Sequence, residues 1–171
     1  MPQPPVPAPS LIVSLMPLVS PVMTWVLVIT GWVVVNHGNN VRESRKETRS
    51  KIDAIIKAID ALETKSIKYY MTDVSVDAHL LEMEIKRDIK ALEAGLKRLS
   101  LSDPHFQTAD AQKDLQNSMT GGDFEQSARV KRPHTDGKLL QISTDARELI
   151  NVMEIAYITK YAKKSRLPWK T

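Results

Sequence analysis

The sequence predicts an all-α protein: one N-terminal transmembrane helix followed by a cytoplasmic helical bundle or coiled-coil hairpin. Three observations lead to this fold class. Residues 1–41 contain no Lys, Arg, Asp or Glu, and a long apolar run lies within them. The highly charged remainder of the chain then carries three apolar stripes at helical spacing.

The apolar run extends over 25 residues, from Leu11 to Val35. At a rise of about 1.5 Å per residue, a helix of this length would cross the roughly 30 Å hydrocarbon layer of a bilayer. Pro17 and Pro21 leave two alternatives, because proline disrupts a helix interior but suits its first turn. The helix either starts near Leu11 with a kink, or starts near Pro21 and continues through residues 36–40.

We assign the transmembrane helix to residues 11–36 and an extended, Pro-rich extracytoplasmic tail to residues 1–10. A cleaved signal peptide is disfavoured because the N-terminal region has no basic residue and no small-residue cleavage site follows the apolar run. A buried core helix is disfavoured because the run is apolar on all of its faces.

The flanking charges predict the orientation of this span. Five basic residues follow it closely: Arg42, Arg45, Lys46, Arg49 and Lys51. The positive-inside rule therefore places residues 41–171 in the cytoplasm and the N-terminus outside, in a single-pass protein of the inner membrane. The overall pI near 9.3 reflects basic clusters beside the span and at the C-terminus, a layout that fits anionic lipid better than nucleic acid. We therefore do not expect direct nucleic-acid binding.

The apolar stripes predict three main cytoplasmic helices, at about 41–71, 77–100 and 136–165. The stripes are Ile52, Ile55, Ile59 and Leu62; Ile85, Ile89, Leu92, Leu96 and Leu99; and Leu139, Ile142, Ala146, Leu149, Met153 and Ala156. None of these faces can be buried by its own helix, so a three-helix bundle or a partner chain is expected. Residues 101–135 are expected to be irregular, apart from a short helix near 109–118.

The first two stripes are two residues out of heptad phase. Residues 41–100 therefore form either one helix with a phase slip or two helices, and we favour two. The break is expected within residues 66–78, which are rich in β-branched and N-cap residues. Thr135 or Asp136 is expected to cap the last helix.

The segment TGGDFE is the clearest turn signal in the irregular region. Its residues are Thr120, Gly121, Gly122, Asp123, Phe124 and Glu125. It resembles a phosphate-binding loop only through its glycines, since no G-x-x-x-x-G-K-[ST] motif and no preceding strand accompany it. The favoured interpretation is a loop in which the glycines take positive φ and Phe124 fills the bundle core.

We find no catalytic constellation, so the chain is expected not to be an enzyme and to need no cofactor or metal. It contains no cysteine, and its four histidines fall in none of the common metal-ligand spacings. His105, Asp123 and His134 would form a metal site only if the loop brought them together, and His79 is expected at the surface. Glu82, Glu84 and Glu93 are expected on solvated helix faces.

The span offers one weak packing face. Thr24, Val28 and Gly31 fall on one side of a helix, and small or hydroxyl residues let neighbouring spans approach closely. This face favours a homo-oligomer, although a span that serves only as an anchor is an equally good interpretation.

Two strings carry a resemblance to a known group. They are residues 31–40 with the following 42–47 (GWVVVNHGNN and RESRKE), and residues 119–125 (MTGGDFE) before the last helix. Together they resemble small single-span bacterial membrane proteins of accessory and defence gene clusters, including a retron-system membrane effector. The resemblance implies a cytoplasmic helical domain held by a partner, such as a nucleoprotein defence complex, and a span that perturbs the inner membrane.

The sequence thus favours a non-enzymatic membrane protein whose helices bind a protein partner or self-associate, with an anti-phage effector implied by the resemblance. Two alternatives stay open. The chain would otherwise be a structural membrane anchor or adaptor, or a nucleotide-binding or enzymatic module built on residues 101–138.

Overall fold

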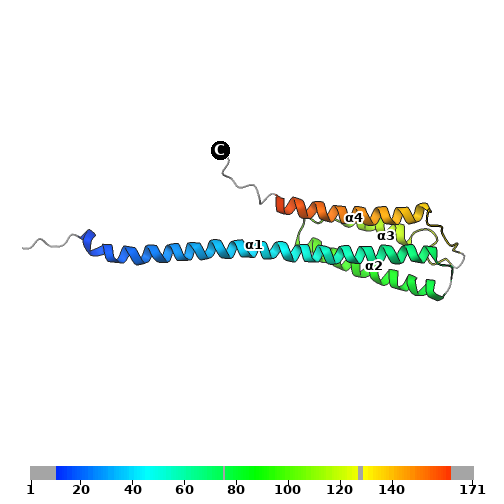
Figure 1. Ribbon diagram of the computed structural model, residues 1–171, viewed down its shortest axis with the longest axis horizontal. Coiled ribbons are helices and arrows are strands. Elements are labelled where there is room, and N and C mark those ends of the chain that lie inside the picture. The colour runs from blue at the N-terminus through cyan, green and yellow to red at the C-terminus, as the bar shows by residue number, and fades with distance from the viewer. Residues whose placement is uncertain (1–10, 75, 127–128, 163–171) are drawn as a thin grey trace, which may run out of the picture. The chain divides into compact units, whose positions relative to one another are not determined.

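The computed structural model describes residues 11–74, 76–126 and 129–162, with side chains from Met23 onward apart from Val76. The described residues form four α-helices and no strand, which confirms the all-α prediction (Figure 1). The helices are α1 Leu11–Met71, α2 Val76–Ser102, α3 Ala109–Thr120 and α4 Gly137–Ala162.

Helix α1 starts at Leu11, as the first of the two sequence alternatives places it, and it continues as one helix far beyond the predicted span. It begins at Leu11, continues through Pro17 and Pro21, and does not end until Met71. Its residues belong to two compact units, Met1–Lys46 and Glu47–Thr171. The chain leaves the helix after Met71 and enters α2 at Val76. Residues 41–100 therefore form two helices rather than one with a phase slip.

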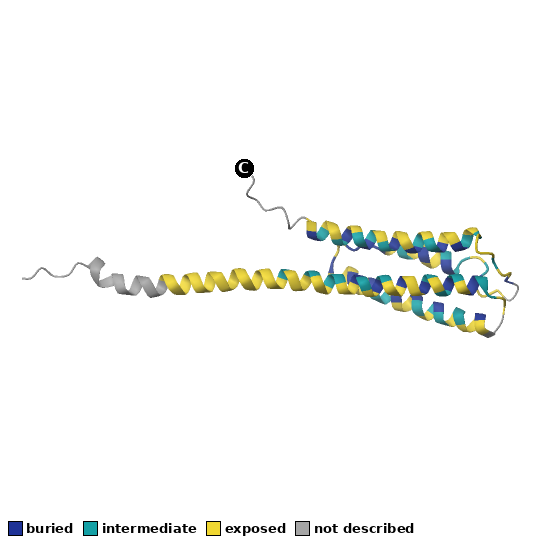
Figure 2. Ribbon diagram, viewed as in Figure 1, coloured by how far each residue is buried: buried dark blue, intermediate teal, exposed yellow. Residues whose placement is uncertain are grey.

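The unit Glu47–Thr171 is built around one apolar core. Every residue of the three predicted stripes is buried in it, with exposed fractions of 9% or less. Figure 2 shows the buried positions recurring along one side of α2 and α4, as the helical period requires. The helical bundle predicted from the stripes is therefore correct, and α1, α2 and α4 supply its three long helices.

Helix α3 and the segments that flank it add a second group of core residues. Leu115 and Met119 of α3 are buried, and so are Phe106 before it and Phe124 after it. Helix α3 packs against α4. The short helix expected near 109–118 is thus confirmed as α3.

The turns between α3 and α4 explain two of the local sequence signals. Asp136 caps α4, since its Oδ1 accepts a hydrogen bond of 2.8 Å from the backbone N–H of Lys138. Gly122 has a φ of +73°, as expected for a loop glycine. The expectation of positive φ is wrong for Gly121, whose φ is −78°. Glycine is needed there for space, because an added Cβ would lie 2.5 Å from the carbonyl oxygen of Asn117.

Among the residues whose side chains are described, no helix is long and apolar enough to cross a bilayer. The side chains of residues 11–22, which form the first part of the predicted span, lie outside the described residues, and so does the predicted tail 1–10.

Candidate functional site

The apolar part of α1 is not covered by other described residues of its unit. Every residue from 23 to 40 is exposed. The large apolar side chains are 51–70% exposed: Met23, Trp25, Val26, Leu27, Val28, Ile29, Trp32, Val33, Val34 and Val35. Exposed apolar patches of this kind mark sites that bind a membrane or another protein. This part of α1 is the first candidate site.

The predicted packing face lies inside this exposed segment. Thr24, Val28 and Gly31 are all exposed, and a Cβ added at Gly31 would meet no described atom within 4 Å. The nearby Thr30 hydroxyl donates to the backbone carbonyl of Val26 over 2.7 Å, so its polar group is satisfied within the helix. The face is therefore open to another molecule.

The five basic residues after the predicted span divide between the two compact units. Arg42, Arg45 and Lys46 belong to the first unit, whereas Arg49 and Lys51 belong to the second. Arg49 bridges Asp53 at 2.9 Å and Glu154 at 2.7 Å. Lys51 pairs with Glu47 at 2.7 Å, as the i,i+4 spacing predicts. Two of the five charges are therefore partly neutralised by carboxylates of the bundle.

The TGGDFE segment contacts the C-terminal end of α1, where two adjacent tyrosines are buried. The Phe124 ring lies 5.1 Å from the Tyr69 ring, and the backbone N–H of Glu125 donates to the Tyr69 hydroxyl over 3.2 Å. The Tyr70 hydroxyl donates to the carbonyl of Met119 over 2.8 Å. Burial raises the pKa of Tyr70, so its phenol stays a neutral donor. Phe124 therefore fills the core as predicted.

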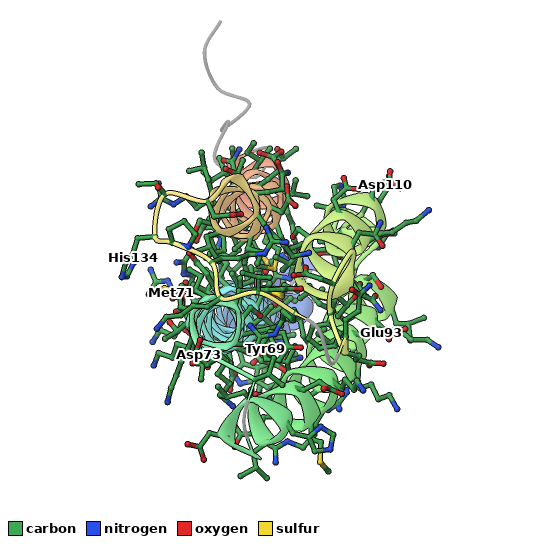
Figure 3. The ribbon with its side chains drawn as sticks, turned by 90° about the vertical axis from the view of Figure 1, so that its right-hand side faces the viewer. Tyr69, Met71, Asp73, Glu93, Asp110 and His134 are labelled. Carbon is green, nitrogen blue, oxygen red and sulfur yellow. The ribbon has the colours of Figure 1, made fainter. Side chains whose placement is uncertain are left out.

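Two arginines of the following loop complete this end of α1, which Figure 3 views end-on. Arg129 stacks on the Tyr69 ring at 4.1 Å and donates to the carbonyl of Thr72 over 2.9 Å. The backbone N–H of Arg132 donates to the carbonyl of Tyr70 over 2.9 Å. These donors satisfy carbonyls that the end of a helix leaves without partners. We call Tyr69, Tyr70, Arg129 and Arg132 the helix-end cluster.

The polar residues of TGGDFE are engaged in the same cluster. The Arg132 guanidinium bridges Asp123 at 3.0 Å and Asp136 at 3.0 Å. The Lys138 ammonium donates to the carbonyl of Gly121 and lies 4.7 Å from the centroid of the Tyr70 ring. Burial lowers the pKa of Lys138. The Gly121 carbonyl and Asp123 are thus paired with the side chains of Lys138 and Arg132, and these contacts stabilise the loop.

Glu82 corrects the expectation of solvated carboxylates on α2. Its side chain is only 12% exposed and pairs with Lys86 at 2.7 Å, and Lys86 also contacts Glu125. Burial alone would raise the pKa of Glu82, but hydrogen bonds from Lys86 and His79 outweigh it and lower the pKa. Glu84 is 45% exposed in its side chain and Glu93 is exposed, in line with the expectation.

The histidines have separate surroundings. The Nδ1 atom of His105 lies 2.9 Å from Asp103, Asp123 is held by Arg132, and His134 is exposed in the loop before α4. No group of three His, Cys, Asp or Glu residues that could hold a metal occurs in the part of the chain that the structure describes. The prediction that His79 lies at the surface is confirmed by a side chain that is 70% exposed.

A groove of about 750 Å³ lies between the C-terminal half of α2 and α3. Its walls and floor include Glu93, Leu96, Ser100, Phe106, Asp110 and Gln116. Figure 3 shows Glu93 and Asp110 pointing outward on the same side of the unit. This α2–α3 groove is the second candidate site, and its volume lies in the range of small-molecule and peptide pockets.

Sequence reasoning missed the partners of the helix-end cluster and the ion pair between Asp103 and Lys160. The adjacent tyrosines at 69 and 70 were a usable signal, because aromatic residues make up only 5% of this chain. A buried pair of this kind at a helix end requires covering residues from elsewhere, although its partners cannot be named from sequence.

No family model, curated protein or solved structure matches this chain. The two candidate sites are therefore interpreted from their geometry and chemistry alone.

Proposed function

We propose that this chain is a non-enzymatic, single-pass protein of the inner membrane. Residues 11–36 form the span, the N-terminus lies outside, and residues 41–171 form a cytoplasmic helical domain that binds a protein partner or self-associates. The observation that carries the proposal is the uncharged part of α1, whose apolar side chains from Met23 to Val35 are exposed.

The energetic argument rests on this exposed surface. Burial of apolar surface is worth about 25 cal/mol per Å², so a segment with this many exposed large side chains gains most from an apolar environment. A bilayer supplies that environment along the whole circumference of the helix, whereas a single protein partner covers one face. The absence of charge through residue 41 removes the main cost of insertion.

The domain from Glu47 onward supports a binding role rather than catalysis. Its buried polar contacts in the helix-end cluster are ion pairs and backbone hydrogen bonds that fix the loop between α3 and α4. The α2–α3 groove adds an accessible surface to this rigid unit. A nucleotide site at TGGDFE is disfavoured, because Asp123 and the carbonyl of Gly121 already face Arg132 and Lys138.

Within this proposal, membrane damage is the effect that fits a defence effector. A single apolar helix satisfies its own backbone and opens no pore, so damage requires several copies. The exposed face at Thr24, Val28 and Gly31 is suited to close packing between spans. Gathering of copies through the cytoplasmic domain, or release from a partner, would raise the local concentration of spans. A structural adaptor would share the topology but not the damage.

A pair of matched double variants tests membrane insertion. Leu27→Arg with Val33→Arg places two charges on exposed apolar positions of α1, and Val130→Arg with Leu140→Arg does the same on exposed apolar positions of the other unit. An arginine near the centre of a span, as at Leu27, costs about 2.5–3.5 kcal/mol on insertion scales, and one nearer the end, as at Val33, costs less. We expect the first variant to leave the carbonate-washed membrane fraction and the second to remain in it. Equal membrane retention of both variants would contradict the proposal.

A further inference from the structure

A small pocket lies where the C-terminal end of α1, the first turns of α2 and the loop after α3 meet, at the end of the unit that Figure 3 views. We call it the α1-end pocket, and its lining includes Tyr69, Val74, His79, Glu82, Glu125 and Arg129. Its volume of about 210 Å³ is below the roughly 300–1,000 Å³ of sites for drug-sized ligands. The pocket therefore suits a small molecule.

Two buried side chains of the lining hold hydrogen-bond donors that the described residues leave unused. Arg129 is 6% exposed, and its Nη1 atom is buried without an acceptor. Tyr69 is 3% exposed, and its hydroxyl accepts a hydrogen bond from the N–H of Glu125 while no described group accepts its own proton. A buried donor without an acceptor is costly, so a ligand that accepts from both would be favoured.

The charges of the lining are also incompletely paired. Arg129 forms no ion pair with a described residue. Glu82 and Glu125 both contact the same ammonium, that of Lys86. Two carboxylates thus share one cation, which leaves one negative charge uncompensated beside one unpaired guanidinium. A ligand that carries one charge of each sign complements such a lining.

The rest of the lining provides access and an apolar contact. The side chain of Glu125 is 51% exposed and Gln126 is exposed. Exposed side chains change rotamer within nanoseconds, so these two can make room for a small solute beside the buried donors. Val74 is 54% exposed and offers an accessible apolar surface in the same pocket.

We propose that the α1-end pocket binds a small zwitterion, an α-amino acid with an apolar side chain. Its carboxylate accepts hydrogen bonds from Arg129 Nη1 and the Tyr69 hydroxyl, its ammonium donates to Glu125, and its side chain contacts Val74. This site goes beyond the proposed membrane function, because all of its residues belong to the unit Glu47–Thr171. Loss of ligand binding would therefore leave the evidence for membrane insertion untouched.

Three related solutes test the zwitterion. L-valine carries both charges, N-acetyl-L-valine lacks the ammonium, and L-valinamide lacks the carboxylate. Calorimetric titration of the full chain in detergent micelles at pH 8 measures each affinity. A hydrogen bond to a charged group is worth about 10- to 100-fold in affinity, so we expect saturable binding of L-valine and at least about tenfold weaker binding of both analogues. No saturable binding of L-valine, or equal binding of the three, would overturn the proposal.

Two carboxylates on the same side of the unit's sequence provide a matched pair of variants. Glu125 lines the pocket, whereas Asp77 is exposed in the first turn of α2 and does not line it. Glu125→Gln should weaken L-valine about tenfold and leave N-acetyl-L-valine unchanged, because only the ammonium loses its partner. Asp77→Asn should change neither affinity. Circular dichroism of both variants confirms that the helices are retained.

The comparison between the two solutes separates a lost contact from a distorted pocket. Glu125→Gln would overturn the proposal if it left the affinity for L-valine unchanged, or if it weakened L-valine and N-acetyl-L-valine equally. Weakening of L-valine to the same extent by Asp77→Asn would also overturn it, since the effect would then belong to the general charge of this end of the unit.

Discussion

The guanidinium of Arg129 lies 4.1 Å from the centroid of the Tyr69 ring and donates a hydrogen bond to the carbonyl of Thr72. One side chain thereby ties the loop before α4 to the end of α1. Arg129 is 6% exposed, so both contacts are largely desolvated. Cation–π contacts are worth about 2 kcal/mol in such surroundings, compared with about 0.5–1 kcal/mol at exposed sites.

Arg129→Ala should therefore destabilise the bundle by about 2–3 kcal/mol through the lost stacking and the lost hydrogen bond. Lys131→Ala is the matched control, because Lys131 is exposed and lies 3.6 Å from an exposed Asp73. Urea unfolding of the full chain, followed by circular dichroism, measures both. If the two variants unfold at the same urea concentration, the contacts of Arg129 in the helix-end cluster do not stabilise the loop before α4.

The sequence predicted the apolar core of the bundle better than the polar and cation–π contacts that join its segments. The spacing of Ile52, Ile85 and Leu139 and their companions follows the helical period, and burial follows the same period, so the stripes identify the core directly. The contacts of Arg129 with Tyr69 and of Lys160 with Asp103 join residues far apart in the chain. No local pattern encodes them, because they depend on how the finished helices pack.

The candidate sites were predictable to different degrees for the same reason. The uncharged run gave the first site from composition alone. The α2–α3 groove depends on where α3 lies against its neighbours, and the apolar residues Leu96 and Phe106 that form its floor look like ordinary core positions in the sequence. Gly121 illustrates the limit at one residue: it was expected to need positive φ, but proximity to Asn117 is what excludes a side chain.

Gly121 and Gly137 differ in the space around them, and this difference gives a second stability prediction. Gly121→Ala would bring a Cβ to 2.5 Å from the backbone oxygen of Asn117, and backbone must move to relieve the clash. We expect a loss of about 1–3 kcal/mol. Gly137→Ala at the start of α4 meets no described atom within 4 Å and should be neutral or stabilising by up to about 1 kcal/mol. Thermal unfolding of both variants measures which is less stable. Equal stability of the two, or a less stable Gly137→Ala variant, would show that the backbone at the C-terminal end of α3 moves without cost.

Asp103 gives the bundle a specific acid sensitivity. Burial alone would raise its pKa, but Lys160 and the backbone and side chain of His105 outweigh burial and lower it from 3.8 to about 2. A lowered carboxyl pKa contributes stability that is present above the unfolded value and lost as pH falls through the folded value. The expected contribution is about 2 kcal/mol above pH 4, lost between about pH 4 and pH 2.

Asp103→Asn isolates this contribution. The variant should be less stable than the parent at pH 6, and the difference should shrink toward pH 2, where the parent carboxylate also becomes neutral. Urea midpoints across this pH range measure it. Asp114→Asn is the control, because Asp114 is exposed and forms no ion pair with a described residue. A constant difference across the range would assign the effect of Asp103 to packing rather than to its charge.

The orientation that we propose predicts that the basic residues after the span control the topology. Arg42, Arg45 and Lys46 are separate from the ion pairs that Arg49 and Lys51 form in the bundle. Replacing the first three with Gln should weaken or scramble the orientation without removing the Glu154 bridge to Arg49. A reporter that is active only in the cytoplasm, fused after Thr171, should be active on the parent and less active on this variant. Activity confined to an external reporter would reverse the topology.

Gly31 provides the sharpest test of membrane damage by packed spans. A Cβ added at Gly31 would meet no described atom within 4 Å, so Gly31→Leu should act mainly on contacts with another molecule. If small residues let the spans approach, a leucine there blocks close packing. Overproduction of the parent without its partner should arrest growth and dissipate the membrane potential, and Gly31→Leu should relieve both effects.

Two controls show whether the damage depends on close packing at Gly31 and on the span itself. Val34→Phe adds as many side-chain carbon atoms as Gly31→Leu at another exposed position of α1 and should leave the toxicity unchanged, and residues 42–171 alone should be harmless. A potential-sensitive dye, read at matched protein levels in the membrane fraction, separates lost activity from lost expression. If residues 42–171 prove as toxic as the full chain, damage does not come from the span, and the bundle with its α2–α3 groove becomes the place to look.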